Sequence, residues 1–535
     1  HTRWATHGIP SEDNAHPHHV GSVVGVHNGI IENFREIKEE LINKGYKFHS
    51  DTDTEVIIQL CSYYTNKGYN NKDAFFKTIG RLEGAFALCF MFKDDEEKLY
   101  VTRRSAPLVI GYGKKDVFVG SDAVSLSNLI ESVIFLDEDD VAIVSKKQTN
   151  IYDKLGKRVN RKKKSVDLNS DIISKGNYQH FMLKEIHEQP SVLKSTQSKY
   201  TSEYFIDFET KFRHLFEVDK IVLVGCGTAY HASMVGEYYF NHFTNKEVST
   251  ELASELRYKK INKNKQILYI FISQSGETMD TLMALKYVKS MNHKSLVITN
   301  SLESSMVREA EVTIPTYAQK EVGVASTKAF TCQLLSLANL ALEVGRMEKS
   351  ISNQIYKKNI NILTKLPSKI DKLIYEFTPN AKTISKKLSQ ANACYFIGRN
   401  IAYPIALEGS LKLKEISYMH SEGFPGGEMK HGPIALIDKD SITICLIPNN
   451  DLFEKSESNA QEISARNGKI IILSSVKNMR KINGEIKVMN MPKENIIDTP
   501  FIYTIPLQLI SYYFALSEGT DIDQPRNLAK SVTVE

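Results

Sequence analysis

The sequence of 535 residues lacks several features that would define its class at once. No apolar run approaches the roughly 18 residues of a membrane span, so we expect no membrane association. Six cysteines are scattered without a C-x-x-C pair, mostly in apolar stretches, which predicts reduced, buried thiols in a cytoplasmic protein. The chain starts at His1 and shows no signal peptide, so we expect the natural protein to begin further upstream.

The chain also has little net charge, +5, and this small excess is local. The segment Lys154–Lys164 carries seven basic residues and no acidic one, and the rest of the chain sums to −2. A single basic run of this kind is typical of a solvated hairpin end and linker. We therefore expect no nucleic-acid binding.

A chain of this length should hold several domains. Residues 1–165 alternate short strands with few helices, and we expect helices at 33–44 and 54–66. This pattern predicts an α+β domain with largely antiparallel sheets. Residues 166–200 are polar and predict a linker, with a break at Pro190.

The later part of the chain alternates strands and helices, the pattern of a doubly wound parallel α/β sheet, and it does so twice. The stretch KIVLVGCGTAYHAS from Lys220 resembles ACYFIGRNIAYPIA from Ala393, with Gly225 corresponding to Gly398. We expect two such domains, at 201–350 and 351–520, and a tail at 521–535.

The turn SQSGET, residues 273–278, lies between an apolar strand and an amphipathic helix. A helix N-terminus has unpaired N–H groups and a partial positive charge, which suit an anion. One helix cap needs one hydroxyl, whereas this turn offers Ser273, Ser275 and Thr278 besides Gln274. No lysine is present, unlike in a Walker nucleotide site, so a phosphate monoester on a small molecule fits better.

Two further hydroxyl-rich clusters lie in the same α/β half: GCGTAYH from Gly225 and GVASTKAF from Gly323. In parallel sheets, ligands gather beyond the carboxyl ends of the strands. Because GCGTAYH and SQSGET each follow a strand directly, we expect them to meet at one ligand. The second half has lost the hydroxyl-rich turn, so the first half should hold the phosphate.

The second α/β half supplies ionisable groups. Glu408, Lys412 and Glu415 share one face of a helix, although ordinary surface salt bridges would give the same spacing. His431 lies in a glycine-flanked loop, where most histidines have no catalytic role, and Lys530 lies five residues from the end, where most lysines are solvated.

The first residues, HTRWATHG, place Arg3 near Trp4 and His7. An Arg together with an Asp, such as Asp53, could hold the carboxylate and the amino group of an amino acid. Asn28 and Gly29 follow in VHNGIIEN, although Asn-Gly is also a common hairpin turn.

Taken together, HTRWATHG, VHNGIIEN, SDTDTEV, KEIHEQP, SQSGETMDT, GVASTKAF, LEGSLKLKEISY, KHGPIAL and DQPRNLAKSVTVE resemble the glutamine–fructose-6-phosphate aminotransferase family, over essentially the whole chain. The resemblance implies a partial N-terminal-nucleophile (αββα) glutaminase domain, two sugar isomerase (SIS) domains and a tail over the active site. It also implies that fructose 6-phosphate and glutamine give glucosamine 6-phosphate and glutamate, in a homodimer, with no metal or organic cofactor.

The resemblance assigns roles in the isomerase half. The sugar phosphate would be bound by Thr228, Ser273, Gln274, Ser275 and Thr278, and the sugar would contact Val324 and Ser326. Lys530 would form a Schiff base, Glu415 would move a proton between C1 and C2, and His431 of the neighbouring subunit would open the ring. Glu408 and Lys412 would line the same site.

In the glutaminase half, the resemblance implies that Arg3, Thr6 and His7 bind the glutamine carboxylate and Asp53 its amino group. Asn28 and Gly29 would form the oxyanion hole, and Trp4 would gate an ammonia channel. The family's nucleophile is an N-terminal cysteine upstream of HTRWATHG, and the printed chain starts at that motif. We therefore expect the chain as printed not to release glutamate from glutamine.

Two other functions share these motifs. A sugar-phosphate isomerase built from the same two domains would not need the glutamine-site residues. A phosphosugar-sensing protein would need the hydroxyl cluster, but not Lys530, Glu415 and His431 together.

Overall fold

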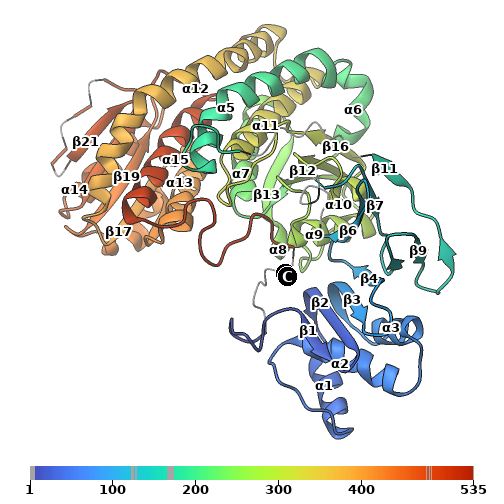
Figure 1. Cartoon of the computed structure of the whole chain (residues 1–535). Helices are drawn as coiled ribbons and strands as arrows, with labels where there is room; N and C mark the ends of the chain where they lie inside the picture. Colours follow the sequence, from blue (N-terminus) through green and yellow to red (C-terminus); the bar gives the residue numbers. More distant parts are fainter. Residues whose placement is uncertain are drawn as a thin grey trace. The chain divides into compact units, whose positions relative to one another are not determined.

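In the computed structural model of the chain, the described residues are 7–121, 126, 129–165, 174–477, 479–480, 482–483 and 485–533. They form two compact units (Figure 1). Unit 1 comprises residues 1–174, 277–279 and 532–535, and unit 2 comprises residues 175–276 and 280–531. Within the described residues, no helix has both the length and the apolar character that crossing a membrane requires.

Unit 1 contains two antiparallel sheets among its described residues, as the short alternating strands predict. One sheet has the order β1-β2-β3-β4-β8-β9-β10 and the other β11-β7-β5-β6. Their bounds are β1 His18–Val20, β2 Val23–Ile31, β3 Gly84–Phe92, β4 Leu99–Arg104, β5 Val109–Tyr112, β6 Val117–Gly120, β7 Ser132–Phe135, β8 Val141–Val144, β9 Thr149–Tyr152, β10 Arg158–Val159 and β11 Lys163–Ser165.

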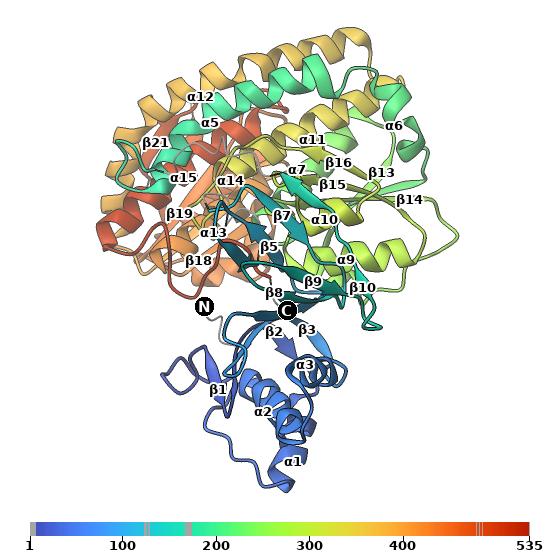
Figure 2. The same cartoon turned by 45° about the vertical axis from the view of Figure 1, so that its right-hand side comes forward.

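Three described helices pack beside the first strands of unit 1 (Figure 2). They are α1 Phe34–Asn43, α2 Asp53–Asn66 and α3 Asn71–Ile79. Side chains before α2 and α3 define where these helices begin, since Thr52 accepts the N–H of Glu55 and Asn70 that of Asp73. The two helices expected at 33–44 and 54–66 are confirmed.

Unit 2 contains two five-stranded parallel sheets with the same connectivity, which confirms the predicted duplication. The first has the order β13-β12-β14-β15-β16 and the second β18-β17-β19-β20-β21. The strands are β12 Lys220–Gly225, β13 Glu247–Leu252, β14 Ile267–Ser273, β15 Lys294–Thr299, β16 Val312–Pro315, β17 Ala393–Gly398, β18 Ser421–Pro425, β19 Ser441–Ile447, β20 Lys469–Ser474 and β21 Glu485–Asn490.

The two corresponding positions, one in each half, require glycine for the same structural reason. Gly225 ends β12 and Gly398 ends β17, and in both cases the first turn of the next helix crosses close to the glycine. A Cβ at Gly225 would lie 2.7 Å from the carbonyl carbon of Ala229, and one at Gly398 would lie 2.3 Å from the oxygen of Ala402. A larger residue would push the helix away from the strand end.

Helices cover both sheets of unit 2, and a continuous buried cluster joins the two halves. Figure 1 shows α5, α11, α12 and α15 running side by side. The helices are α5 Phe181–Lys199, η1 Tyr200–Tyr204, α6 Phe208–Phe216, α7 Thr228–Phe243, α8 Ala253–Leu256, α9 Met279–Ser290, α10 Ser305–Glu309, α11 Lys328–Met347, α12 Asn353–Leu388, α13 Ala402–Ser417, η2 Gly426–His431, η3 Pro433–Leu436, α14 Phe453–Ser464 and α15 Thr499–Glu518.

The predicted linker at 166–200 needs correction. Residues 166–173 lie outside the described residues, but α5 covers most of the remainder and buries Met182 and Ile186 in the core of unit 2. Pro190 lies inside this helix and does not break it. Proline cannot donate to the carbonyl of Ile186 four residues earlier, and the side-chain amide of Gln189 donates to that oxygen instead, at 3.1 Å.

Candidate active site

The turn after β14 has the compact form that an anion site requires. The Oγ of Ser273 accepts the N–H of Gly276 at 3.0 Å, which closes the turn. Gly276 has φ +66°, and a Cβ there would lie 2.1 Å from the Oγ of Ser304, so glycine alone fits. The Oγ of Ser275 lies 2.9 Å from the Oγ of Ser531 in the C-terminal tail, and Gln274 and Thr278 are half-buried.

Thr228, in the second hydroxyl cluster, lies beyond a strand adjacent to β14. It opens α7 directly after β12, and β12 pairs in parallel with β14. The two turns therefore lie at the same edge of the sheet, as predicted. The Thr228 hydroxyl donates to Glu408 at 3.1 Å and accepts from Lys412 at 3.1 Å, so it contacts the ionisable groups of the other half.

Glu408, Lys412 and Glu415 form a buried cluster on α13. The Nζ of Lys412 lies 2.6 Å from Glu415 and 3.5 Å from Glu408. The Lys412 side chain is 1% exposed and that of Glu408 is 2% exposed, which overturns the alternative of ordinary surface salt bridges. Burial alone would lower the pKa of Lys412, but the two carboxylates outweigh it and raise that pKa.

Lys530 lies against a carboxylate that no motif in the sequence distinguishes. Its Nζ forms an ion pair with Oε2 of Glu321, whose side chain is fully buried. Ser326 donates to the same oxygen at 3.2 Å. Burial would raise the pKa of Glu321, but the Lys530 ammonium and backbone N–H groups outweigh it and lower the pKa. Glu321 also acts electrostatically on Lys412, so the two clusters are close enough to influence each other.

The tail reaches the same loop through its backbone. The N–H of Val324 donates to the carbonyl of Asp523 at 3.0 Å, and the Asp523 carboxylate accepts from the N–H groups of Phe181 and Met182. Residues 321–326 are therefore attached to the segment that leads to Lys530. The structure thus brings Lys530, Val324 and Ser326 together.

His431 is placed differently from the other predicted residues. It ends η2 and is exposed, outside the buried clusters of Lys412 and Lys530. The histidine found at the Lys412 cluster is His231, whose Nδ1–H donates to Glu408 at 2.8 Å. A lone histidine in GCGTAYH gave no signal of this contact, because Glu408 lies 177 positions away in the sequence.

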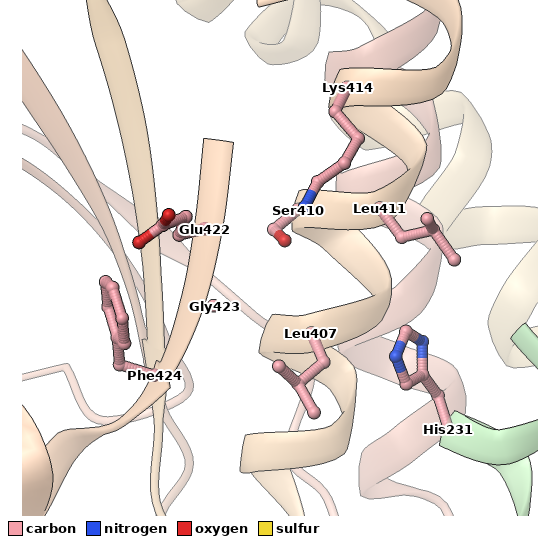
Figure 3. A pocket seen from close by; sticks show the side chains of 8 residues that line it. All are labelled: His231, Leu407, Ser410, Leu411, Lys414, Glu422, Gly423 and Phe424. Atoms are coloured by element: carbon pink, nitrogen blue, oxygen red, sulfur yellow. The ribbon is translucent and has the colours of Figure 1, made fainter. Parts of the chain in front are cut away.

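His231 also lines a pocket of about 260 Å³ between α13 and β18 (Figure 3). Figure 3 shows its ring facing Leu407 and Leu411 of α13, with Glu422 and Phe424 across the pocket. Because the ring contacts Glu408 as well, His231 lies between this pocket and the buried cluster. No motif in the sequence predicts this pocket.

In unit 1, Asn28 and Gly29 lie inside β2, paired with Ala87 and Phe86 of β3. The alternative of an Asn-Gly hairpin turn is therefore wrong. Gly29 has φ +141°, and a Cβ there would lie 2.0 Å from the carbonyl oxygen of Ala85. A strand distorted at this point can turn a backbone N–H away from the sheet ladder, as an oxyanion hole requires.

Asp53 and His7 are the other described residues of the predicted glutamine site. Asp53 is 4% exposed, begins α2, and accepts the N–H of Ile31 at 3.0 Å. His7 is half-buried and its ring packs edge-on against Phe34 at 4.6 Å. Arg3, Trp4 and Thr6 lie outside the described residues.

Cys61 on α2 and Cys89 on β3 have no features of a nucleophile. Burial raises the pKa of each thiol to about 12, so almost none is thiolate at neutral pH.

Two known domain families match the two parts of the chain. The glutamine amidotransferase domain family matches residues 1–128, and the SIS domain family matches residues 214–343 and 387–518. Over 542 aligned residues, the chain is 43% identical to the glutamine–fructose-6-phosphate aminotransferase (isomerizing) of Mesorhizobium japonicum, with 100% of the chain and 88% of that protein covered. The chain belongs to the glutamine–fructose-6-phosphate aminotransferase family. The enzyme of the same name from Agrobacterium fabrum is 42% identical over the same shares.

Solved structures agree with the membership of this aminotransferase family. The C-terminal domain of glucosamine-fructose-6-phosphate aminotransferase from Francisella tularensis is 40% identical, with a TM-score of 0.64, and covers 66% of the chain and 100% of that domain. The tagatose-6-phosphate ketose/aldose isomerase of Escherichia coli has a TM-score of 0.57 at 14% identity over 67% of the chain and 98% of its own, which shows a common fold alone.

Proposed function

We propose that this protein converts fructose 6-phosphate and glutamine into glucosamine 6-phosphate and glutamate, the first step of amino-sugar synthesis. The observation that carries the proposal is the pairing of Lys530 with a buried carboxylate, Glu321, in the unit that holds the hydroxyl-rich turn. Family membership over the whole chain and the amidotransferase match at residues 1–128 support the use of glutamine.

The phosphate of the sugar would bind at the turn after β14. Ser275 and Gln274 are half-buried there, and Ser273 keeps the turn closed by accepting the N–H of Gly276. Thr278 would add a hydroxyl at the start of α9. Thr228 contacts Glu408 and Lys412, and we assign it to the junction between the phosphate turn and the reacting part of the sugar.

Lys530 would react with the carbonyl at C2 of the open-chain sugar. The ammonium first passes a proton to Glu321, its direct partner, and the free amine then attacks the carbon. Loss of one water molecule gives the imine between Nζ and C2. Backbone and side chain of Val324 and Ser326 would contact the sugar, because both lie on the loop that holds Glu321.

The change from ketose to aldose needs a base that removes a proton from C1 and returns one to C2. We assign this role to Glu415, which is half-buried beside the Lys412 ammonium. Lys412 would hold this carboxylate in place, and Glu408 would in turn position Lys412. His431 is exposed on one chain, and we propose that a second copy in a homodimer supplies it for ring opening.

Glutamine would bind in unit 1. We propose Asn28 and Gly29 for the oxyanion hole, Asp53 for the amino group, and His7 with Arg3 and Thr6 for the carboxylate. Asp53 accepts one backbone N–H and keeps further acceptor capacity for an ammonium group. Trp4 is proposed as the gate for ammonia.

The test follows nitrogen from one substrate to the other. The protein expressed from its intact gene is incubated with fructose 6-phosphate and glutamine labelled with ¹⁵N in the amide. We expect ¹⁵N in glucosamine 6-phosphate, detected by mass spectrometry, and none with Lys530→Arg, which keeps the charge but cannot act as a free amine. Formation of glucose 6-phosphate without any amino sugar would instead support a simple isomerase.

A further inference from the structure

The motif KEIHEQP on α5 contains one buried acid that the proposed reaction does not yet use. Glu188 and Gln189 have evident structural partners, since Glu188 pairs with Lys328 at 2.7 Å and Gln189 bonds Gln508 at 2.8 Å. These contacts attach α5 to α11 and α15. Glu185, 2% exposed on the same helix, makes no ion pair in the described part of the chain.

The carboxylate of Glu185 is attached to the loop after Glu321. Its Oε1 accepts the N–H groups of Val322 and Gly323, the latter at 3.2 Å. A Cβ on Gly323 would lie 3.0 Å from its Oε2, so the carboxylate lies directly against the loop backbone. Among the described residues, this Oε2 is buried and has no hydrogen-bond partner. Glu185 is thus bonded to the backbone that directly follows Glu321, and Glu321 itself pairs with Lys530.

We propose that Glu185 is a positioning residue for Lys530, which fixes the loop that carries Glu321 and holds one of the protons that Glu185, Glu321 and Lys530 share. The inference rests on the proposed role of Lys530 in imine formation. In this role Glu185 does not touch the substrate. It controls when the Lys530 amine is unprotonated.

The charges of Glu185, Glu321 and Lys530 explain why one of the two carboxylates must hold a proton. Two buried carboxylates face one ammonium, so complete ionisation would leave a buried negative charge beside an unpaired oxygen. Burial raises the pKa of Glu185 to about 8, the negative charge of Glu321 adds to this, and Lys530 opposes it. Below that pH, Glu185 carries a proton while Glu321 stays ionised against Lys530.

The other charged groups around α5 interact with one another. Lys175 pairs with Asp523 at 3.2 Å, Lys184 and Lys328 pair with Glu188, and Asp371 acts on His187. They leave Glu321 and Lys530 as the charges that dominate at Glu185.

Ionisation of Glu185 should favour the reactive state of Lys530. An ionised Glu185 adds a second buried negative charge against the loop that carries Glu321, and neighbouring buried carboxylates disfavour an ionised Glu321. The proton then moves from Nζ to the Glu321 carboxylate: one N–H bond breaks, one O–H bond forms, and the neutral amine is released. No other reactant is needed.

The experiment traps the imine with borohydride across pH 6.5 to 9.5 on the full protein, with fructose 6-phosphate and peptide mass mapping of Lys530. For the wild type we expect the trapping rate to rise through about pH 8, where Glu185 ionises. Glu185→Gln still accepts both loop N–H groups but cannot titrate, so this rise should disappear. Glu185→Ala also removes the loop contact and should lower trapping at least about tenfold, because small misplacements of a reacting group cost factors of this size.

The matched control is Glu343→Gln, which neutralises another buried glutamate on α11, paired with Arg346. It should keep the wild-type rise. A wild type without a rise near pH 8, a Glu185→Gln variant that retains it, or a Glu185→Ala variant that traps at the wild-type rate would each overturn the inference. The first of these needs no variant to fold. If the wild type gives no Lys530 adduct at any pH, it is the proposed function that fails.

Discussion

The Oγ of Ser531 lies 2.9 Å from the Oγ of Ser275, which joins the C-terminal tail to the turn that we assign to the sugar phosphate. The residue before Ser531 is Lys530, which pairs with Glu321 on another loop of the same unit. A phosphate that binds at Ser275 therefore acts one residue away from the proposed reactive amine. The contributions of the Ser275 and Ser531 hydroxyls to phosphate binding can be measured separately by mutating each serine.

Replacing Ser275 with Ala should weaken binding of a hexitol 6-phosphate, which has no carbonyl to react, by about tenfold or more. A hydrogen bond to a charged phosphate contributes roughly 1.5–3 kcal/mol. Ser531→Ala should have a smaller effect, since a bond between two hydroxyls contributes roughly 0.5–1.5 kcal/mol. Calorimetric titration measures both. Ser290→Ala, at the exposed far end of α9, is the control. Unchanged affinity in Ser275→Ala would place the phosphate elsewhere.

The arrangement of the two α/β halves was predictable because it depends on local pattern. Gly225 and Gly398 each follow an apolar strand and precede a helix, and the close helix crossing at both explains why the repeat is visible in the sequence. Pro190 misled the prediction of a break, because the compensating amide of Gln189 is a matter of side-chain geometry. Propensity alone cannot show that a freed carbonyl finds another donor.

The candidate site was predictable where spacing along one element determines it. Glu408, Lys412 and Glu415 share a helix face by periodicity, but their burial depends on Thr228 and His231 from the other half. Glu321 and Glu185 are single acids in ordinary contexts, and their relation to Lys530 arises from contacts across more than 100 residues. Nothing local in the sequence distinguishes them from solvated glutamates.

Replacing Lys412 with Met should destabilise the protein by roughly 3–5 kcal/mol, because two buried carboxylates lose their shared cation. Because folding raises the pKa of Lys412, its contribution to stability is fully present below the lysine pKa of the unfolded chain, near 10.4. That contribution is lost only at higher pH. The loss should therefore be constant between pH 6 and 9 in calorimetric scans. Adding Glu415→Gln should recover part of it, while exposed Lys414→Met serves as the control. A Lys412→Met protein as stable as the wild type would contradict the buried cluster.

Cys61 and Cys89 should resist a glutamine analogue that carries an electrophilic ketone. With each pKa raised to about 12 by burial, the thiolate fraction at pH 7.5 is on the order of 10⁻⁴ or less. Peptide mass mapping after exposure of the native protein should show neither residue labelled. Iodoacetamide in denaturant should label both, which establishes that they are free thiols. Labelling of either by the analogue would make it a candidate nucleophile.

The last prediction concerns His27, which lies on β2 next to the proposed oxyanion residues. Burial lowers its pKa to about 4, although Asp53, whose Oδ2 lies 3.8 Å from its Nδ1, opposes this. The folded state thus keeps the ring neutral, whereas the unfolded chain takes up a proton below about pH 6.5. The unfolded state then binds more protons, and the stability of unit 1 falls as pH decreases from about 6.5 to about 4, by roughly 3 kcal/mol. His27→Gln should flatten this part of the profile in thermal scans, whereas His19→Gln, an exposed histidine of β1, should retain it. A His27→Gln protein that loses stability with acid as steeply as the wild type would show that another group is responsible.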